Sequence, residues 1–225
     1  MVTPKDLVSI FFDDTGKSYD RVVNCATFGR DNFWKKQIVS KISGGIILDL
    51  ACGTGILTRM IAKKFPSSEI VGVDITQNYL DVAKKNFDFR NISFVLQDAE
   101  KLDLDKKFDF IVSSYIPKYC DACTLIAKCM THLNPGGVII LHDFVYPKSI
   151  RKIWHFYFGV LQFLGNFIPS WKAAFLELPK LIESSNWVSD YTGIMNENGL
   201  DVTLEYHTFG CSCILSGKTR LGCTV

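Results

Sequence analysis

The chain has 225 residues, of which 48% are hydrophobic and 21% are charged, so intrinsic disorder is excluded and one domain with a buried core is expected. Lysine and arginine total 25 against 23 acidic residues, and the resulting net charge of +2 lacks the basic excess that nucleic-acid binding requires. Aromatic residues make up 13%, and much of that excess lies in one segment described below.

The first residues, MVTPKDLVSIFFDD, have no basic stretch followed by an apolar run and a small-residue cleavage site, so no secretory signal peptide is expected. Eight cysteines are too few for a disulfide scaffold, which favours reduced thiols and a cytoplasmic location. One group has the ligand types of zinc: Cys120, Cys123, Cys129 and His132. Because these residues share one expected helix, they cannot all reach within about 2.0–2.3 Å of an ion. No metal site is predicted.

From residue 46 onward, short apolar runs alternate with segments of helical spacing. Strands are expected over 45–50, 70–74, 92–96, 110–113 and 138–141, with helices over 54–65, around 79–83 and over 120–133. A helix over 191–198 and strands over 200–207 and 211–215 follow. This alternation is typical of an open, doubly wound α/β sheet, which binds ligands at the carboxyl ends of its strands.

Residues 148–191 carry ten of the aromatic side chains. The part from Ile153 to Trp171 contains no Lys, Arg, Asp or Glu, so a membrane-spanning helix of about 20 residues has to be weighed. Pro169, together with glycine and polar residues, interrupts this part, because proline ends a helix. We therefore expect a helical lid that forms an apolar tunnel for the ligand, with a simple hydrophobic cover or a homodimer contact as the alternative.

The segment ILDLACGTG at 47–55 is the strongest chemical signal. Its glycines allow close approach of a ligand, and the following helix offers unpaired backbone amides. A dinucleotide fingerprint requires a third glycine where Thr58 stands, and Asp49 disfavours a pyrophosphate but suits a cationic, amino-acid-bearing ligand. Asp74 ends the second strand, where it can accept hydrogen bonds from a ribose diol. Asp98 follows the third strand, where it can accept from an adenine amino group.

With these residues the sequence resembles the class I S-adenosylmethionine-dependent methyltransferases, over the segments VGVDIT, QDAEKL, FDFIVSSY and LNPGGVIILHDF. The flanking segments YDRVVN (19–24), TFG (27–29) and WK (34–35) resemble the ubiquinone/menaquinone biosynthesis C-methyltransferases. The resemblance implies a Rossmann-like mixed sheet in a single domain, 1–225. Its parts are an amino-terminal helical cap (1–43), a cofactor-binding core (44–147), an aromatic-rich helical lid inserted after the fifth strand (148–191), and a closing helix and strands (192–225).

By this resemblance the cofactor is S-adenosylmethionine. The residues that it places at the cofactor are Tyr19, Asp49, Ala51, Gly53, Thr54, Gly55, Asp74, Ile75, Asp98, Ala99 and Ser114. The partner is a small, apolar acceptor of aromatic or quinol type. Peripheral membrane contact through residues 153–171 is an accompanying expectation, and a charge at Phe158 would then release the protein from the membrane.

The sequence departs from this family in two places near the acceptor. The family carries Arg-Asn shortly after the fourth strand, where this chain has YIPKY at 115–119. The fifth strand ends in His142-Asp143 in place of an apolar residue and Glu. Carbon methylation of a quinol requires a base that removes a hydroxyl proton. His142 is the first candidate and His155 in the aromatic segment the second, while a packed, inert histidine is the alternative for each.

Three functions follow from the sequence. The first is methyl transfer to a carbon of a quinol-like acceptor, and the second is O- or N-methylation of another small molecule. The third is a nicotinamide-dependent oxidoreductase on the same sheet, against which Thr58 and Asp49 argue.

Overall fold

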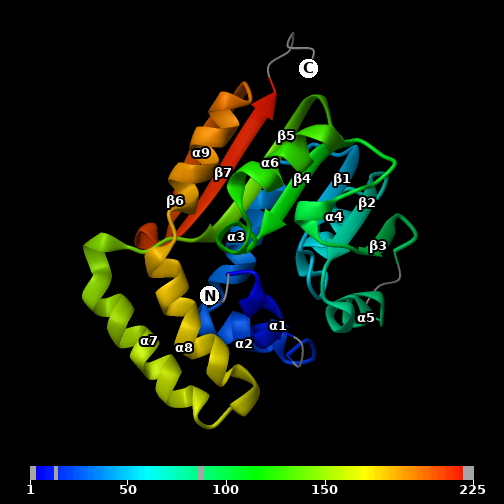
Figure 1. Cartoon of the computed structure of the whole chain (residues 1–225). Helices are drawn as coiled ribbons and strands as arrows, with labels where there is room; N and C mark the ends of the chain where they lie inside the picture. Colours follow the sequence, from blue (N-terminus) through cyan, green and yellow to red (C-terminus); the bar gives the residue numbers. More distant parts are fainter. Residues whose placement is uncertain (1–3, 13–14, 86–88, 220–225) are drawn as a thin grey trace.

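A seven-stranded mixed sheet forms the centre of the molecule in the computed structural model, which describes residues 4–12, 15–85 and 89–219 (Figure 1). Its strands are β1 (Ile46–Leu50), β2 (Glu69–Asp74), β3 (Ile92–Leu96), β4 (Phe108–Ser114), β5 (Leu133–Phe144), β6 (Leu200–His207) and β7 (Ser212–Thr219). Their order is β3-β2-β1-β4-β5-β7-β6; β1 to β5 are parallel, and β7 runs antiparallel to both its neighbours. The predicted doubly wound mixed sheet is confirmed.

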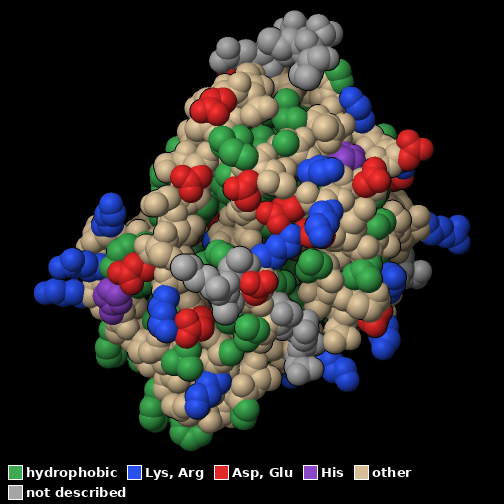
Figure 2. All heavy atoms as spheres, in the orientation of Figure 1, with side chains coloured by type: hydrophobic (Ala, Val, Ile, Leu, Met, Phe, Trp, Pro, Cys, Tyr) green, Lys and Arg blue, Asp and Glu red, His purple; other side chains and the backbone are tan. Residues whose placement is uncertain are grey.

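Helices cover both faces and one end of this sheet. They are α1 (Asp6–Phe12), α2 (Tyr19–Ala26), α3 (Arg30–Ser40), α4 (Ile56–Lys64), α5 (Gln77–Lys85), α6 (Ala122–His132), α7 (Arg151–Gly165), α8 (Pro169–Ser184) and α9 (Trp187–Glu197). Four of them, α1, α2, α7 and α8, lie beyond the end of the sheet opposite to the arrowhead of β7 (Figure 1). The end of the molecule that α7 and α8 form carries several hydrophobic side chains on its surface (Figure 2).

The aromatic segment folds into two helices and not into a membrane span. Within the described ranges, no helix is both long and apolar enough to cross a membrane. α7 ends at Gly165, and Pro169 is the first residue of α8, a position where its missing N–H costs no hydrogen bond. The helix expected to begin at residue 191 begins at Trp187. Trp187 and Tyr191 are buried in the core against the sheet.

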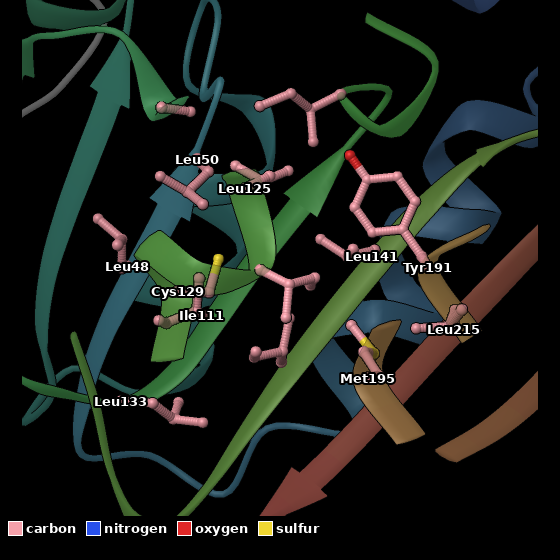
Figure 3. Close-up of a cluster of buried hydrophobic side chains, with 14 of the residues drawn as sticks. Leu48, Leu50, Ile111, Leu125, Cys129, Leu133, Leu141, Tyr191, Met195 and Leu215 are labelled. Carbon is pink, nitrogen blue, oxygen red and sulfur yellow. The ribbon is translucent and has the colours of Figure 1, made fainter. Parts of the chain in front are cut away.

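The two faces of the sheet bury separate hydrophobic clusters. On one face, α6 and α9 pack Cys129, Tyr191 and Met195 against strand residues such as Leu48 (Figure 3). On the other face, α3 and α4 cover residues that include Ile47. Successive strand residues point to opposite faces, so a strand covered on both sides is an uninterrupted apolar run. A third cluster joins α1, α2, α7 and α8 over the carboxyl ends of the parallel strands.

Candidate functional site

A largely apolar cavity of about 580 Å³ lies between the carboxyl ends of the parallel strands and the helices α1, α2, α7 and α8, which are together called the cap from here on. Strand-end residues line one part of it. Aromatic side chains from the cap line the rest, namely Phe11, Phe12, Tyr19, Trp154, Tyr157, Phe158, Trp171 and Phe175. The cavity therefore has a polar end built by the sheet and an apolar end built by the cap.

Most of the residues predicted to bind the cofactor line this one cavity. They are Tyr19, Asp49, Ala51, Gly53, Thr54, Asp74, Ile75, Asp98, Ala99 and Ser114. Gly55 is outside the lining, and its φ of 79° turns the chain into the first residue of α4. Parallel strands end at the same edge, which is why residues spread over the chain converge here.

The loop after β1 has a backbone shape that a ligand can approach closely. Ala51 and Gly53 both have left-handed backbone, with φ of 52° and 57°. Asp74 fixes this loop from the neighbouring strand, because its Oδ2 accepts a hydrogen bond of 2.8 Å from the Gly53 amide and its Oδ1 accepts one of 2.8 Å from Thr76. An acid held at this place presents acceptors to hydroxyl groups, which suits the ribose of the predicted cofactor.

Asp49 is buried at the end of β1, where it lines the cavity. Desolvation raises its pKa to about 7, while a hydrogen bond of 2.6 Å from the Thr58 hydroxyl opposes that rise. Thr58 stands where a dinucleotide fingerprint has its third glycine, and here its side chain supports the acid. A carboxylate of this kind attracts the ammonium group of a methionine moiety only when it is ionised.

Binding of S-adenosylhomocysteine should therefore strengthen as the pH rises from 6 to 8. An acid with a pKa near 7 is about one-tenth ionised at pH 6 and about nine-tenths ionised at pH 8, so we expect an affinity gain of about tenfold. Isothermal titration across this range measures it. Asp49→Asn should bind weakly at every pH, and Thr58→Val should move the midpoint upward. A wild-type affinity that does not change with pH contradicts this role for Asp49.

Asp98 is engaged with the amino-terminal cap. Its Oδ1 accepts from the Glu100 amide, and its Oδ2 accepts a hydrogen bond of 2.6 Å from Lys5, which also pairs with Glu100. Lys5 is separated from Asp98 by 93 positions, so no local pattern in the sequence indicates the contact. The acid predicted to meet the adenine thus also ties α1 to the edge of the site.

Aromatic rings from α2, α5 and α8 pack together beside the glycine loop. Tyr19 packs on Tyr79 with ring centroids 5.3 Å apart and stacks on Trp171 at 6.0 Å. The Thr54 hydroxyl donates a hydrogen bond of 2.5 Å to Asp20, the residue after Tyr19. The cap is therefore joined directly to the loop that follows β1.

The structure does not place the two predicted bases at the cavity. His142 is fully buried, with its Nδ1 2.9 Å from the Ser114 hydroxyl and its Nε2 2.9 Å from the Ser212 hydroxyl. Burial lowers its pKa well below the usual value, which favours a neutral ring held between two hydroxyls. His155 is on the exposed side of α7, 3.1 Å from the Tyr146 hydroxyl. Neither histidine is among the residues lining the cavity.

Two buried ion pairs, and not the two histidines, border the cavity. Lys35 pairs with Asp31 on α3, and Lys118 pairs with Asp143 at 2.7 Å. Both lysines line the cavity. Sequence reasoning did not assign either pair, although Lys118 lies in the segment where the chain departs from the family. The signal in the sequence is Lys118 itself, a charged residue among apolar and aromatic neighbours.

Comparisons with known proteins identify the relatives of the chain. Residues 47–137 match the family model of a methyltransferase domain. The ubiquinone/menaquinone biosynthesis C-methyltransferase of Desulfotalea psychrophila is 31% identical over 76% of this chain and 73% of that protein. The demethylmenaquinone methyltransferase of Thermotoga maritima is 26% identical over 92% of this chain and 93% of that protein. The malonyl-[acyl-carrier protein] O-methyltransferase of Priestia megaterium is 27% identical over 62% of this chain and 52% of that protein.

Solved structures share the fold at low sequence identity. The magnesium protoporphyrin IX methyltransferase of Synechocystis PCC 6803 with bound SAM has a TM-score of 0.68 and 15% identity, over 98% of this chain and 99% of that chain. The DhpI–SAH complex has a TM-score of 0.70 and 12% identity, over 97% of both chains. At these identities the likeness establishes the architecture.

Proposed function

Since the chain belongs to the class I S-adenosylmethionine-dependent methyltransferases, in the family of the ubiquinone/menaquinone biosynthesis C-methyltransferases, we propose that it methylates a ring carbon of a quinol-like acceptor. S-adenosylmethionine is its cofactor, and the nicotinamide-dependent alternative is wrong because the relatives are methyltransferases. The observation that carries the proposal is the cavity, which has acids of the strand ends at one end and a lining of aromatic rings at the other.

The strand-end residues fit the cofactor. S-adenosylmethionine, when bound, supplies an electrophilic methyl group on a positively charged sulfur. Asp49 is the acid for its cationic end, Asp74 the acceptor for its ribose, and Asp98 with Ala99 the partners of its adenine. Tyr19, Ala51, Gly53, Thr54, Ile75 and Ser114 complete the wall, and Gly55 shapes the turn behind it.

The apolar end of the cavity fits a flat aromatic acceptor or a prenyl tail. Rings such as Trp154, Phe158 and Trp171 offer stacking surface and exclude water, and only a few polar groups remain to orient the acceptor. Methyl transfer is an in-line displacement, so the contribution of the protein is mainly to position the acceptor and keep the site dry.

The test supplies the enzyme with a demethylmenaquinol analogue bearing a short prenyl tail, and separately with phenol, amine and thioester acceptors. Mass spectrometry and NMR of the product locate the methyl group. We expect methylation of the quinol at a ring carbon, and restored quinone methylation in a cell that lacks this step. A methyl group found only on oxygen or nitrogen would instead favour O- or N-methylation of another small molecule. The similarity to an O-methyltransferase supports this second candidate.

We also propose that α7 docks on an anionic membrane surface, where a prenylated acceptor would reside, while the protein is otherwise cytoplasmic. On α7 and the turn after it, the side chains of Ile153, Phe156, Phe163 and Phe167 are 64–76% exposed. The three phenylalanines do not line the cavity, whereas Ile153 is at its edge. Residues 148–176 contain no acidic residue but include the exposed Lys148, Arg151, Lys152 and Lys172. An apolar stripe flanked by basic residues is the pattern of a helix that lies in a lipid interface.

The double variant Phe156→Glu/Phe163→Glu should lose vesicle binding. Introduced charges oppose insertion of the stripe, so we expect the fraction that co-sediments with vesicles containing anionic lipid to fall at least fivefold, with turnover of a short, water-soluble acceptor retained. Leu204→Glu/Tyr206→Glu, on the exposed face of β6, is the matched control. Phe158, the residue suggested by the sequence, does not serve, since it is buried 4.5 Å from the Trp154 ring. Lipid docking is contradicted if the double variant co-sediments with vesicles as the wild type does, or if the substitutions dissociate a dimer without affecting vesicle binding.

A further inference from the structure

A buried polar cluster borders the cavity where β4 ends. Asp31 and Lys35, one turn apart on α3, are 3% and 5% exposed and form an ion pair. The Tyr115 hydroxyl donates a hydrogen bond of 2.8 Å to Asp31 Oδ1, across 84 positions of the chain. The Lys35 ammonium lies 4.9 Å from the centre of the Tyr115 ring. The buried acid is thus connected to the cavity through two residues that line it, Tyr115 and Lys35.

Tyr115 is held in an unfavourable backbone conformation. Its φ is 79°, in the left-handed region that a bulky residue rarely adopts. Its amide donates to the His142 carbonyl at 2.7 Å, and its ring stacks on Phe144 with centroids 5.0 Å apart. Such strain persists only where surrounding contacts impose it, and it concentrates at functional sites. The contacts of Tyr115 keep its hydroxyl on Asp31 while the residue lines the cavity.

We propose that Tyr115 and Asp31 form a proton relay that receives the hydroxyl proton of the aromatic acceptor, with Lys35 as the fixed counter-charge. This inference rests on the proposed function, because only an acceptor with an ionisable ring hydroxyl needs the relay. Tyr115 is the catalytic residue that contacts the acceptor. Asp31 acts through Tyr115, and Lys35 positions Asp31.

The relay is balanced in protons and charge. The acceptor O–H bond breaks, and its proton binds the Tyr115 oxygen while Tyr115 passes its own proton to Asp31 Oδ1. The acceptor becomes a phenolate, Tyr115 remains a neutral hydroxyl, and Asp31 becomes a neutral carboxylic acid. The negative charge thereby moves from Asp31 towards the ring carbon that receives the methyl group. When that carbon later releases its proton to water, Asp31 returns its proton through Tyr115 to the acceptor oxygen.

Other ionisable groups near the cavity are less suited to this step. Asp143 does not line the cavity, and its carboxylate accepts hydrogen bonds from the Lys118 ammonium and from two backbone amides. Asp49 faces the end of the cavity assigned to the cofactor, and the two histidines do not line the cavity. Tyr115 combines a place in the lining with a hydrogen bond to a carboxylate.

A chromogenic phenol tests the relay without turnover. The probe is 4-nitro-1-naphthol, whose ionised form absorbs visible light, bound together with S-adenosylhomocysteine at a pH where the free probe is mostly protonated. We expect wild-type protein to bind it as the phenolate. Tyr115→Phe, which removes one hydroxyl and keeps the ring, should bind it as the neutral phenol. Asp31→Asn/Lys35→Met, which replaces the whole ion pair and leaves no unpaired charge, should do the same.

Turnover provides the second readout. Tyr115→Phe should lower kcat on the quinol about a hundredfold with little change in KM, and the loss should shrink for acceptors whose hydroxyl is more acidic. Affinity for S-adenosylhomocysteine should be retained, and Tyr206→Phe on the surface is the matched control. If Tyr115→Phe ionises the bound probe as wild type does, the relay is wrong and the proposed function stands. If wild type neither binds the probe nor methylates any aromatic hydroxyl compound, the proposed function fails together with the relay.

Discussion

Asp74→Ala should weaken binding of S-adenosylhomocysteine by about a hundredfold or more. The substitution removes an acceptor proposed for the ribose and also releases the Gly53 and Thr76 amides, each bonded to Asp74 at 2.8 Å. Hydrogen bonds to a charged group contribute about 1.5–3 kcal/mol each, and a hundredfold loss corresponds to about 2.8 kcal/mol. Isothermal titration measures the affinity.

Two variants separate ligand contact from loop support in this experiment. Asp74→Asn keeps a side-chain oxygen at the site but lacks the charge, so it should show an intermediate loss. Asp81→Ala removes an exposed acid on α5, where it accepts a bond from Gln77, and should bind as wild type does. Normal affinity in Asp74→Ala would exclude Asp74 from the cofactor site.

Lys118→Met should lower the free energy of unfolding by about 3–5 kcal/mol, the usual cost of removing one partner from a buried pair. The Lys118 and Asp143 side chains are 2% and 0% exposed, so the substitution leaves a carboxylate with neither water nor counter-charge. In a chain of 225 residues this loss lowers the melting temperature by roughly 10 °C. Differential scanning calorimetry and urea unfolding measure both quantities.

The pH dependence identifies the cause of that loss. Burial raises the pKa of Asp143, and Lys118 opposes the rise, so removing Lys118 raises that pKa further. The folded variant then binds a proton that the unfolded chain releases, and its stability increases as the pH falls from neutral towards the unfolded-state value. Lys118→Met/Asp143→Asn, which removes both charges and keeps the acceptor oxygen, should recover most of the stability at pH 8. A deficit that is the same at pH 5 and pH 8 would contradict this explanation.

The sheet and its polar edge could be predicted because their signals are local. Apolar runs closed by an acid marked β1 and β2, and parallel topology brings Asp49, Asp74 and Asp98 to one edge whatever the loops between them do. The glycine loop likewise depends on neighbours in sequence. For these residues, the place in the strand-helix pattern of the sequence nearly determines the place in the folded sheet.

The parts that could not be predicted depend on partners far apart in the chain. His142 is held between the hydroxyls of Ser114 and Ser212, and Ser212 is 70 positions away in the chain. The Tyr115 hydroxyl donates to Asp31 across 84 positions. Similarly, the sequence locates the aromatic excess in residues 148–191 but does not tell which side of each helix faces inward, and Phe158 is buried. Which face of an element meets a neighbour is settled by packing, and one sequence carries little of that information.

The antiparallel strand β7 has a consequence for the life of the protein in a cell. It pairs with β5 from Val138 to Phe144 and so covers a run, VIIL, that is apolar, uncharged and strongly inclined to form intermolecular strands. The packing beside β7 is close, because a Cβ at Gly217 would lie 2.8 Å from the Met195 sulfur and 3.4 Å from the Leu200 Cβ, and both residues would have to shift. A substitution that loosens the β6–β7 hairpin would leave this edge of β5 exposed whenever the sheet opens, although the hairpin is remote from the acceptor. The exposed strand could then pair with other molecules and aggregate, which would increase the demand on chaperones and proteases.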